Sequence, residues 1–146
     1  MSITVDYQDL EHALYWVSSA PDFDAEAFFS RSTGKFWCSN ADGPVDKDFP
    51  DDVEDGTEYL KFPHKNDLDL GRDLVYRFIT DQVPHLERKT RDLFRHRGAY
   101  SRFKGLLSKE GHLQSWYDYE NRATRVALEQ WATEYGFTVR HASSAA

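Results

Sequence analysis

The chain has 146 residues, of which 40% are hydrophobic and 15% aromatic. This mixture can bury a core, so it excludes a wholly disordered chain, and the length suits one domain rather than two. The formal net charge of -7 disfavours a global electrostatic grip on nucleic acid or an anionic membrane, although it leaves room for a local basic site.

Cysteine usage and apolar runs bear on the compartment. Cys38 is the only cysteine, so no intramolecular disulfide forms and a cysteine-based zinc site is nearly excluded. The first residues lack the basic segment and apolar run of a signal peptide. No apolar stretch approaches the roughly 20 residues that cross a bilayer. We therefore expect a cytoplasmic protein with no membrane contact.

The N-terminal region predicts one helix. Asp6 is a good N-cap residue, and Asp9 favours the first turn. Apolar residues then recur at helical spacing: Leu10, Ala13, Leu14 and Val17. We place this helix over about residues 7–18, ending before Pro21.

A β-hairpin and a third strand follow. Aromatic runs flank residues 32–34, and Gly34 can take the positive φ that closes a short turn, so we expect a hairpin over Phe28 to Cys38. Residues 57–62 alternate in the strand pattern and add a third strand. Residues 40–57 form a loop between them, with seven carboxylates: Asp42, Asp46, Asp48, Asp51, Asp52, Glu54 and Asp55.

The second half of the chain predicts helices. A helix from Asn66 onward is broken at Pro84. A second helix ends at Gly98, and a third ends near Gly111. The strongest periodicity spans residues 113–135, where one wide apolar face is expected: Leu113, Trp116, Tyr117, Tyr119, Ala123, Val126, Ala127, Trp131 and Tyr135.

These elements predict an α+β fold. A small antiparallel hairpin or three-stranded sheet follows an N-terminal helix, and a bundle of about four helices completes the chain. We expect residues 1–138 to form a single domain, with Gly136 as the C-cap of the last helix. Residues 139–146 are expected to be a mobile tail, because they have little to bury.

Three segments carry a family resemblance: residues 28–35 (FFSRSTGK), residues 98–104 (GAYSRFK), and residues 116–119 (WYDY) followed by Trp131 and Gly136. The chain resembles a bacterial group, the uncharacterised protein family number zero-one-five-eight of the UPF series. Its members show a strand with Asp-Leu-Glu-Thr-Gly-Glu, an acidic middle, a Gly-x-Phe-x-Arg-Phe-Lys element and a terminal helix that opens with Trp-Tyr or Trp-Phe.

The resemblance covers most of the chain, from the first helix to Gly136. It implies a fold family and a bacterial, cytoplasmic origin, and it implies no activity. Two positions depart from the family pattern. Arg31 and Ser32 replace an acidic pair at the hairpin turn, which weakens the idea of a carboxylate site there, and Tyr100 replaces the usual Phe.

No motif for a metal or cofactor stands out. A calcium loop beginning at Asp51 would place Val53 at a ligand position and Phe62 at the distal position, which rules out the standard EF-hand. The histidines lack zinc-site spacing, and no nucleophile elbow, P-loop or dinucleotide motif occurs. Cys38 follows Trp37 in an expected strand and favours a packed, unreactive thiol. We expect no metal and no cofactor.

Glu120 falls inside the apolar arc of the last helix. A half-buried carboxylate usually has a partner, and Arg102 and Lys104 are candidates. A structural salt bridge is the favoured interpretation. The alternative is a general acid or base with a raised pKa, which would make the protein a small, hydrolase-like enzyme with Glu120 near Arg102.

The best functional candidate is a basic element over residues 88–104. It holds seven cations and one carboxylate, Asp92, together with Tyr100 and Phe103. The simplest interpretation is a solvated helix face that pairs with the protein's own acidic loop. The functional interpretation is an anion site at the start of the helix after Gly98, formed by Arg95, Arg97, Ser101, Arg102 and Lys104.

The leading functional hypothesis is a non-enzymatic interaction or regulatory module with an Arg-rich surface. Its partner would be an anionic protein or a phosphate-bearing ligand, and nucleic acid is disfavoured by the net charge. The small enzyme that uses Glu120 is the alternative. An enzyme needs a concave pocket with convergent polar groups, whereas a binding module can use an open face.

Overall fold

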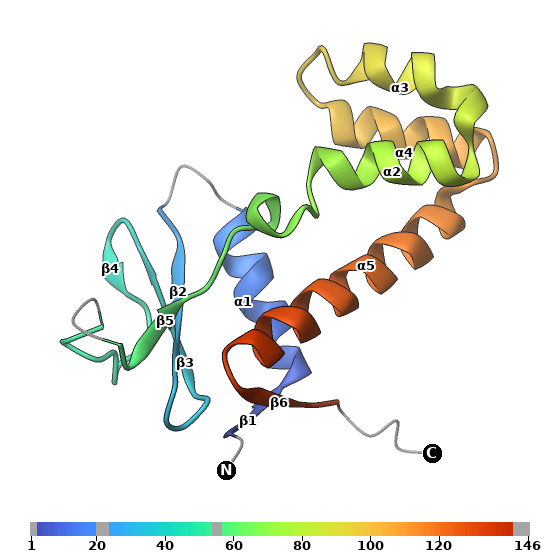
Figure 1. The fold of residues 1–146 in the computed structure, drawn as a ribbon. Coiled ribbons are helices and arrows are strands. Elements are labelled where there is room, and N and C mark those ends of the chain that lie inside the picture. The colour runs from blue at the N-terminus through green and yellow to red at the C-terminus, as the bar shows by residue number, and fades with distance from the viewer. Residues whose placement is uncertain (1–2, 20–23, 54–56, 142–146) are drawn as a thin grey trace. The chain divides into compact units, whose positions relative to one another are not determined.

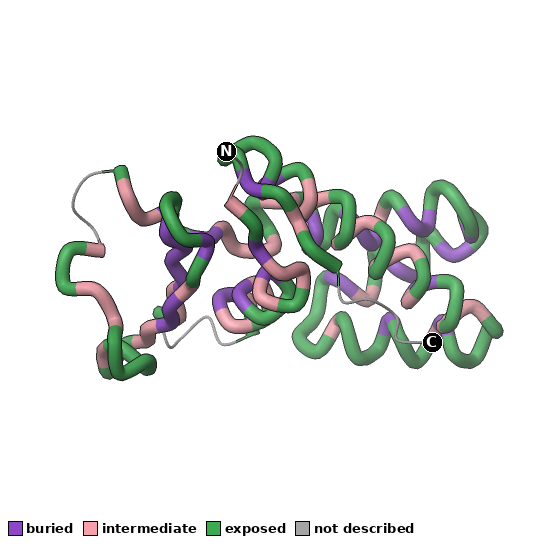
Figure 2. Tube along the Cα trace, turned by 90° about the horizontal axis from the view of Figure 1, so that it is seen from below, coloured by how far each residue is buried: buried purple, intermediate pink, exposed green. Residues whose placement is uncertain are grey.

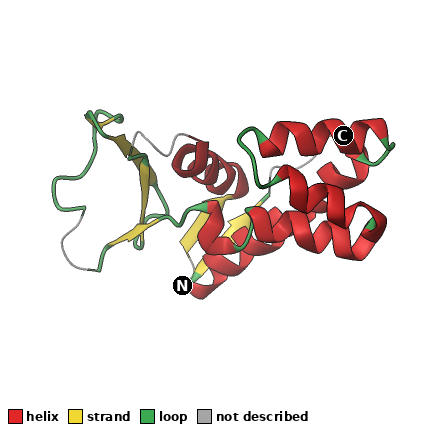
Figure 3. Cartoon of the chain, turned by 90° about the horizontal axis from the view of Figure 1, so that it is seen from above, coloured by secondary structure: helices red, strands yellow, loops and turns green. Residues whose placement is uncertain are grey.

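The computed structural model describes residues 3–19, 24–53 and 57–141. The chain divides into two compact units, one formed by residues 1–68 with 126–146 and the other by residues 69–125. We call them unit 1 and unit 2 and describe each by itself. All strands of the described residues lie in unit 1, so the α+β fold class is confirmed (Figure 3). A single domain over residues 1–138 stays a prediction.

Unit 1 contains a four-stranded antiparallel sheet with the order β4-β3-β2-β5 (Figure 1). The hairpin is confirmed, and β2 pairs with β3 so that Phe28 lies opposite Trp37. The expected third strand is also confirmed, because β5 pairs with β2. A short further strand from the acidic loop pairs with β3. The strands are β2 (Glu26–Ser30), β3 (Phe36–Asn40), β4 (Gly43–Pro44) and β5 (Tyr59–Lys61).

The hairpin turn needs glycine for two reasons. Gly34 has φ +76°, a conformation that side chains rarely adopt. A Cβ atom at this position would also lie 2.7 Å from the backbone oxygen of Thr4. Both the turn and the close approach of strand β1 (Ile3–Asp6) therefore depend on the missing side chain.

Helix α1 (Tyr7–Ser19) lies at the expected position. Its buried residues are Leu10, Ala13 and Val17, as the apolar spacing predicts. The Trp16 indole N–H lies 3.1 Å from the carbonyl oxygen of Glu26 and 3.0 Å from that of Ser39. This shared donor attaches the helix to strands β2 and β3.

A second, two-stranded sheet joins the two ends of the chain in unit 1. Strand β1 (Ile3–Asp6) pairs in parallel with β6 (Phe137–Arg140). The Arg140 Nε atom donates a 2.6 Å hydrogen bond to Oδ1 of Asp6. Val139 and Arg140 therefore belong to a strand, which corrects the expected tail over 139–146 at these two positions. Residues 142–146 lie outside the described residues.

The core of unit 1 combines aliphatic side chains with a group of packed aromatic rings, and buried residues are purple in Figure 2. Phe29 of β2 is fully buried, and its ring centroid lies 5.5 Å from that of Trp131. The Trp131 ring lies 4.7 Å from the ring of Phe62, which directly follows β5. Such edge-to-face aromatic contacts add specific geometry to the large apolar area that these rings bury.

Unit 2 consists of helices. The expected break at Pro84 is confirmed, because α2 ends just before it. The second helix was expected to end at Gly98 but ends at Leu93, and Gly98 at φ +73° instead precedes α4. One expectation is wrong at its start: residues 65–68 form a 3-10 turn, and α2 begins only at Arg72 after Asp69 at φ +58°. The elements of the region are η2 (Lys65–Leu68, in unit 1), α2 (Arg72–Gln82), η3 (Pro84–Leu86), α3 (Glu87–Leu93) and α4 (Ala99–Lys109).

Helix α5 (Leu113–Glu134) contributes its first part to unit 2 and its last part to unit 1. Trp116 and Trp131 are 1% and 6% exposed, which confirms that both are core residues. The expected apolar face is wrong at Val126 and Tyr135, which are exposed, while Leu128 and Ala132 are buried. In unit 1 the core therefore covers the side of α5 that carries Leu128, Trp131 and Ala132, and not the side that carries Val126.

Candidate anion-binding surface

A proline separates helix α2 from helix α3. Helix α2 ends at Gln82 with Val83 as its C-cap, and Pro84 lacks an N–H group and cannot extend that helix. The chain then turns through η3 into α3. Leu86, Thr90 and Phe94 are buried at a spacing of four residues, so the same helix must present the residues between them to solvent.

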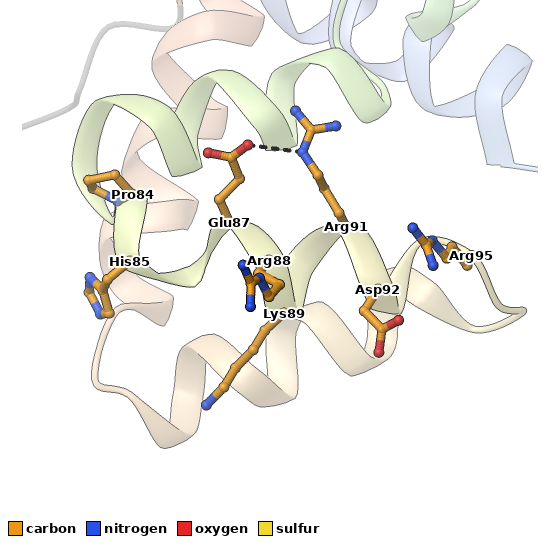
Figure 4. Close-up of a pocket in the computed structure, with 8 residues that line it drawn as sticks. All are labelled: Pro84, His85, Glu87, Arg88, Lys89, Arg91, Asp92 and Arg95. Carbon is orange, nitrogen blue, oxygen red and sulfur yellow. Dashed lines mark hydrogen bonds and ion pairs between the residues drawn. The ribbon is translucent and has the colours of Figure 1, made fainter.

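An open depression of about 770 Å³ lies over this exposed side of α3 (Figure 4). Four cations and two carboxylates border it, together with the His85 ring. The lining residues are Pro84, His85, Glu87, Arg88, Lys89, Arg91, Asp92 and Arg95. The cations outnumber the carboxylates, so the depression favours an anion.

Arg91 already has partners within unit 2. Its Nε atom lies 3.0 Å from Oε1 of Glu87, an ion pair at the i, i+4 spacing (Figure 4). Its guanidinium also lies 4.8 Å from the centre of the Tyr76 ring, a distance that allows cation–π attraction. These contacts orient the Arg91 side chain and give its charge a counter-ion within the same helix.

The other cations of the depression, Arg88, Lys89 and Arg95, are exposed. Within the part of the chain that the structure describes, no ion pair or hydrogen bond involves Arg88, Lys89 or Arg95. In Figure 4 the Lys89 side chain leaves α3 on the side opposite to the Glu87–Arg91 pair. We call Arg88, Lys89 and Arg95 the basic surface.

The residues expected to form the anion site are only partly brought together. Arg95 lines the depression, whereas Arg97, Ser101 and Arg102 are exposed and do not line it. Lys104 is also exposed, and its Nζ atom lies 5.9 Å from the centre of the Tyr117 ring. Of the predicted site residues, only Arg95 lines this depression, and an anion site at the start of α4 stays a prediction.

The sequence interpretation missed Arg88 and Lys89 as site residues. The available signal was the spacing of Leu86, Thr90 and Phe94, which are four residues apart. If that row is buried, Arg88 and Lys89 must be exposed on the other side. Threonine is usually exposed, so Thr90 was not predicted to be a core residue. In the structure it is fully buried.

The alternative site around Glu120 has less geometric support. Glu120 is half-buried on α5 and interacts electrostatically with Tyr100. Burial is the main cause that raises the pKa of Tyr100 above its ordinary value. Neither Glu120 nor Arg102 lines the depression over α3. A pairing between Glu120 and Arg102 stays a prediction.

The remaining candidates for chemistry are metal-ligating side chains and the thiol of Cys38. Among residues 3–19, 24–53 and 57–141, no group of three or more His, Cys, Asp or Glu side chains is arranged to hold a metal ion. Cys38 is buried in β3, where burial, and to a smaller extent the charge of Asp46, raises the pKa of its thiol to about 11. Such a thiol is a poor nucleophile near neutral pH.

Comparison with family models, curated proteins and solved structures found no match to this chain. The resemblance to the UPF family therefore stays a prediction. No helix within the described residues combines the length and apolar character that a membrane span requires. We therefore infer a function from the arrangement of charged side chains in the structure itself.

Proposed function

We propose that this protein is a non-enzymatic interaction or regulatory module that binds an anionic partner through unit 2. The basic surface forms the centre of the contact. Arg97, Arg102 and Lys104 are also exposed, and they extend the positive charge along the chain into α4.

One observation carries this proposal: Arg88, Lys89 and Arg95 line one open depression and form no ion pair among the residues that the structure describes. A charge that only solubilises a helix is usually interspersed with the opposite sign, as Glu87 and Arg91 are here. Arg88, Lys89 and Arg95 share the depression with Asp92, but within the described residues they form no ion pair with it or with any other carboxylate. Two of the three are arginines, whose planar guanidinium binds a carboxylate or phosphate through two parallel hydrogen bonds.

Two labelled probes test the proposal, a poly-glutamate peptide and a single-stranded oligonucleotide, each followed by fluorescence anisotropy at low salt. The variant Arg88→Ala/Lys89→Ala/Arg95→Ala should bind at least one of them about tenfold more weakly than wild type, because each exposed ion pair contributes roughly 0.5 kcal/mol. Binding should also weaken as salt is added.

A matched control removes three other exposed cations of unit 2: Lys109→Ala/Arg122→Ala/Arg125→Ala. This variant has the same net charge as the test variant. If both variants lose binding equally, the overall charge of the protein matters and the basic surface does not. If wild type binds neither probe at low salt, the proposed function is wrong.

A further inference from the structure

The charges of this chain are separated between its two units. Unit 2 has twelve Lys and Arg against eight Asp and Glu, a formal charge of +4. Unit 1 has six Lys and Arg against seventeen Asp and Glu, a formal charge of -11. The two values account for the net charge of -7. A chain that is acidic overall thus holds both halves of an electrostatic contact.

The acidic half has its own unpaired charges, in the loop between β3 and β5. Two of its carboxylates are used inside unit 1: Oδ2 of Asp46 accepts a 2.7 Å hydrogen bond from the Cys38 N–H, and Asp48 pairs with Lys35 at 2.5 Å. The carboxylates of Asp42, Asp51 and Asp52 are exposed and take part in no ion pair within the described ranges. We call these three residues the acidic patch.

We infer that the partner of the basic surface is the acidic patch of a second copy of this chain. The inference rests on the proposed function, because it names the anion that the basic surface receives. Each copy carries one basic surface and one acidic patch. Two copies related by a two-fold axis can therefore exchange two equivalent contacts, which is the commonest geometry of soluble homo-oligomers.

A carboxylate partner fits this chain better than a nucleic acid does. Unit 1 carries a formal charge of -11, which repels a phosphate polymer wherever the polymer approaches that unit. In a pair of copies, the exposed carboxylates of the acidic patch are the groups that the basic surface attracts. Exposed ion pairs are individually weak, so the pairing should be reversible and sensitive to salt.

Sedimentation equilibrium of the full chain tests the inference. Wild type should form dimers at low salt, and its dissociation constant should rise at least about tenfold when salt is raised to a few hundred millimolar. This measurement uses no variant, so it does not depend on whether a substituted chain folds. Wild type that stays monomeric at high concentration and low salt would overturn the inference.

Two charge-reversal variants test whether the basic surface and the acidic patch contact each other directly. The first variant is Arg88→Glu/Lys89→Glu/Arg95→Glu, and the second is Asp42→Lys/Asp51→Lys/Asp52→Lys. Each variant alone brings like charges together in both contacts and should be monomeric. An equal mixture brings opposite charges together in both contacts, so it should form dimers that contain one copy of each variant. Circular dichroism confirms that both variants are folded.

The same experiments distinguish a second copy from other partners of the basic surface. A mixture that stays monomeric overturns the inference, and so does a wild-type protein whose basic surface pairs only with the acidic patch of its own chain. If wild type is monomeric but binds the oligonucleotide or poly-glutamate probe through the basic surface, the inference fails while the proposed function stands. If wild type dimerises and each charge-reversal variant also dimerises by itself, other residues form the contact and the inference is also overturned.

Discussion

The Ser30 hydroxyl donates a 2.6 Å hydrogen bond to Oε1 of Glu58. Ser30 ends strand β2 and is buried, and Glu58 directly precedes strand β5. The same carboxylate oxygen accepts bonds from the Ser32 hydroxyl at 2.6 Å and from the Ser32 amide at 3.2 Å. One carboxylate thus joins the hairpin turn to the neighbouring strand.

These bonds predict how the stability of the protein depends on pH. The Ser30 hydroxyl, followed by the Ser32 hydroxyl and amide, lowers the pKa of Glu58 below its ordinary value of 4.5. A group with a lower pKa in the folded state stabilises the fold above its unfolded pKa, and this contribution is lost as pH falls through the folded value. Glu58→Gln should therefore lower the free energy of unfolding at pH 7.

Urea unfolding at several pH values checks this prediction. The difference between wild type and Glu58→Gln should be constant from pH 7 to about pH 5 and should shrink in more acidic solution, where Glu58 becomes protonated and resembles Gln. Glu11→Gln on the exposed side of α1 is the control and should show no such difference. A Glu58→Gln effect that does not change with pH would show that the charge of Glu58 is not involved.

Gly34 should tolerate alanine less well than another glycine with the same backbone conformation. Gly34→Ala strains a residue at φ +76° and also places a Cβ atom 2.7 Å from the Thr4 oxygen. Gly136 has φ +83° with nothing within 4 Å of its built Cβ. Gly136→Ala should therefore cost only the left-handed backbone strain, about 1–2 kcal/mol, and Gly34→Ala should cost more. Equal losses in urea unfolding would contradict the close contact.

Truncation of Trp131 should strongly destabilise unit 1. The side chain is 6% exposed and its ring contacts those of Phe29 and Phe62. Trp131→Ala should lower the free energy of unfolding by about 3–5 kcal/mol, the usual cost of removing a buried aromatic side chain. Val126→Ala on the same helix is the control: Val126 is 46% exposed, so this change should stay within about 0.5 kcal/mol.

Cys38 should resist alkylation while the protein is folded. With its pKa raised to about 11 by burial, roughly 0.1% of the thiol is ionised at pH 8, against about 10% for a thiol at the ordinary value of 9.0. Mass spectrometry after iodoacetamide treatment should find labelling at least about a hundredfold slower in buffer than in concentrated urea. Equally fast labelling in both solutions would show that the thiol is accessible in the native protein.

Local patterns predicted most of the elements, because their causes are local. Leu10, Ala13 and Val17 are spaced for one buried helix face, and that face is buried. The turn at Gly34 depends on a glycine that can take positive φ, and the hairpin forms around it. Strands β1 and β6 could not be predicted in this way, because each forms by pairing with the other. Ile3 pairs with Phe137, and the local sequence of either segment does not indicate a partner at the other end of the chain.

The amino-acid sequence by itself determined helix α1, the hairpin around Gly34 with its neighbouring strand, and the gathering of positive charge between residues 88 and 104. Only the tertiary structure decided which of those charges are available. Arg91 is paired with Glu87 and lies over Tyr76, whereas Arg88 and Lys89 remain exposed beside it. Helical periodicity is a property of the backbone, but the covered side of a helix depends on what packs against it. The burial of Thr90 therefore had to be seen in the fold before the basic surface could be assigned to α3.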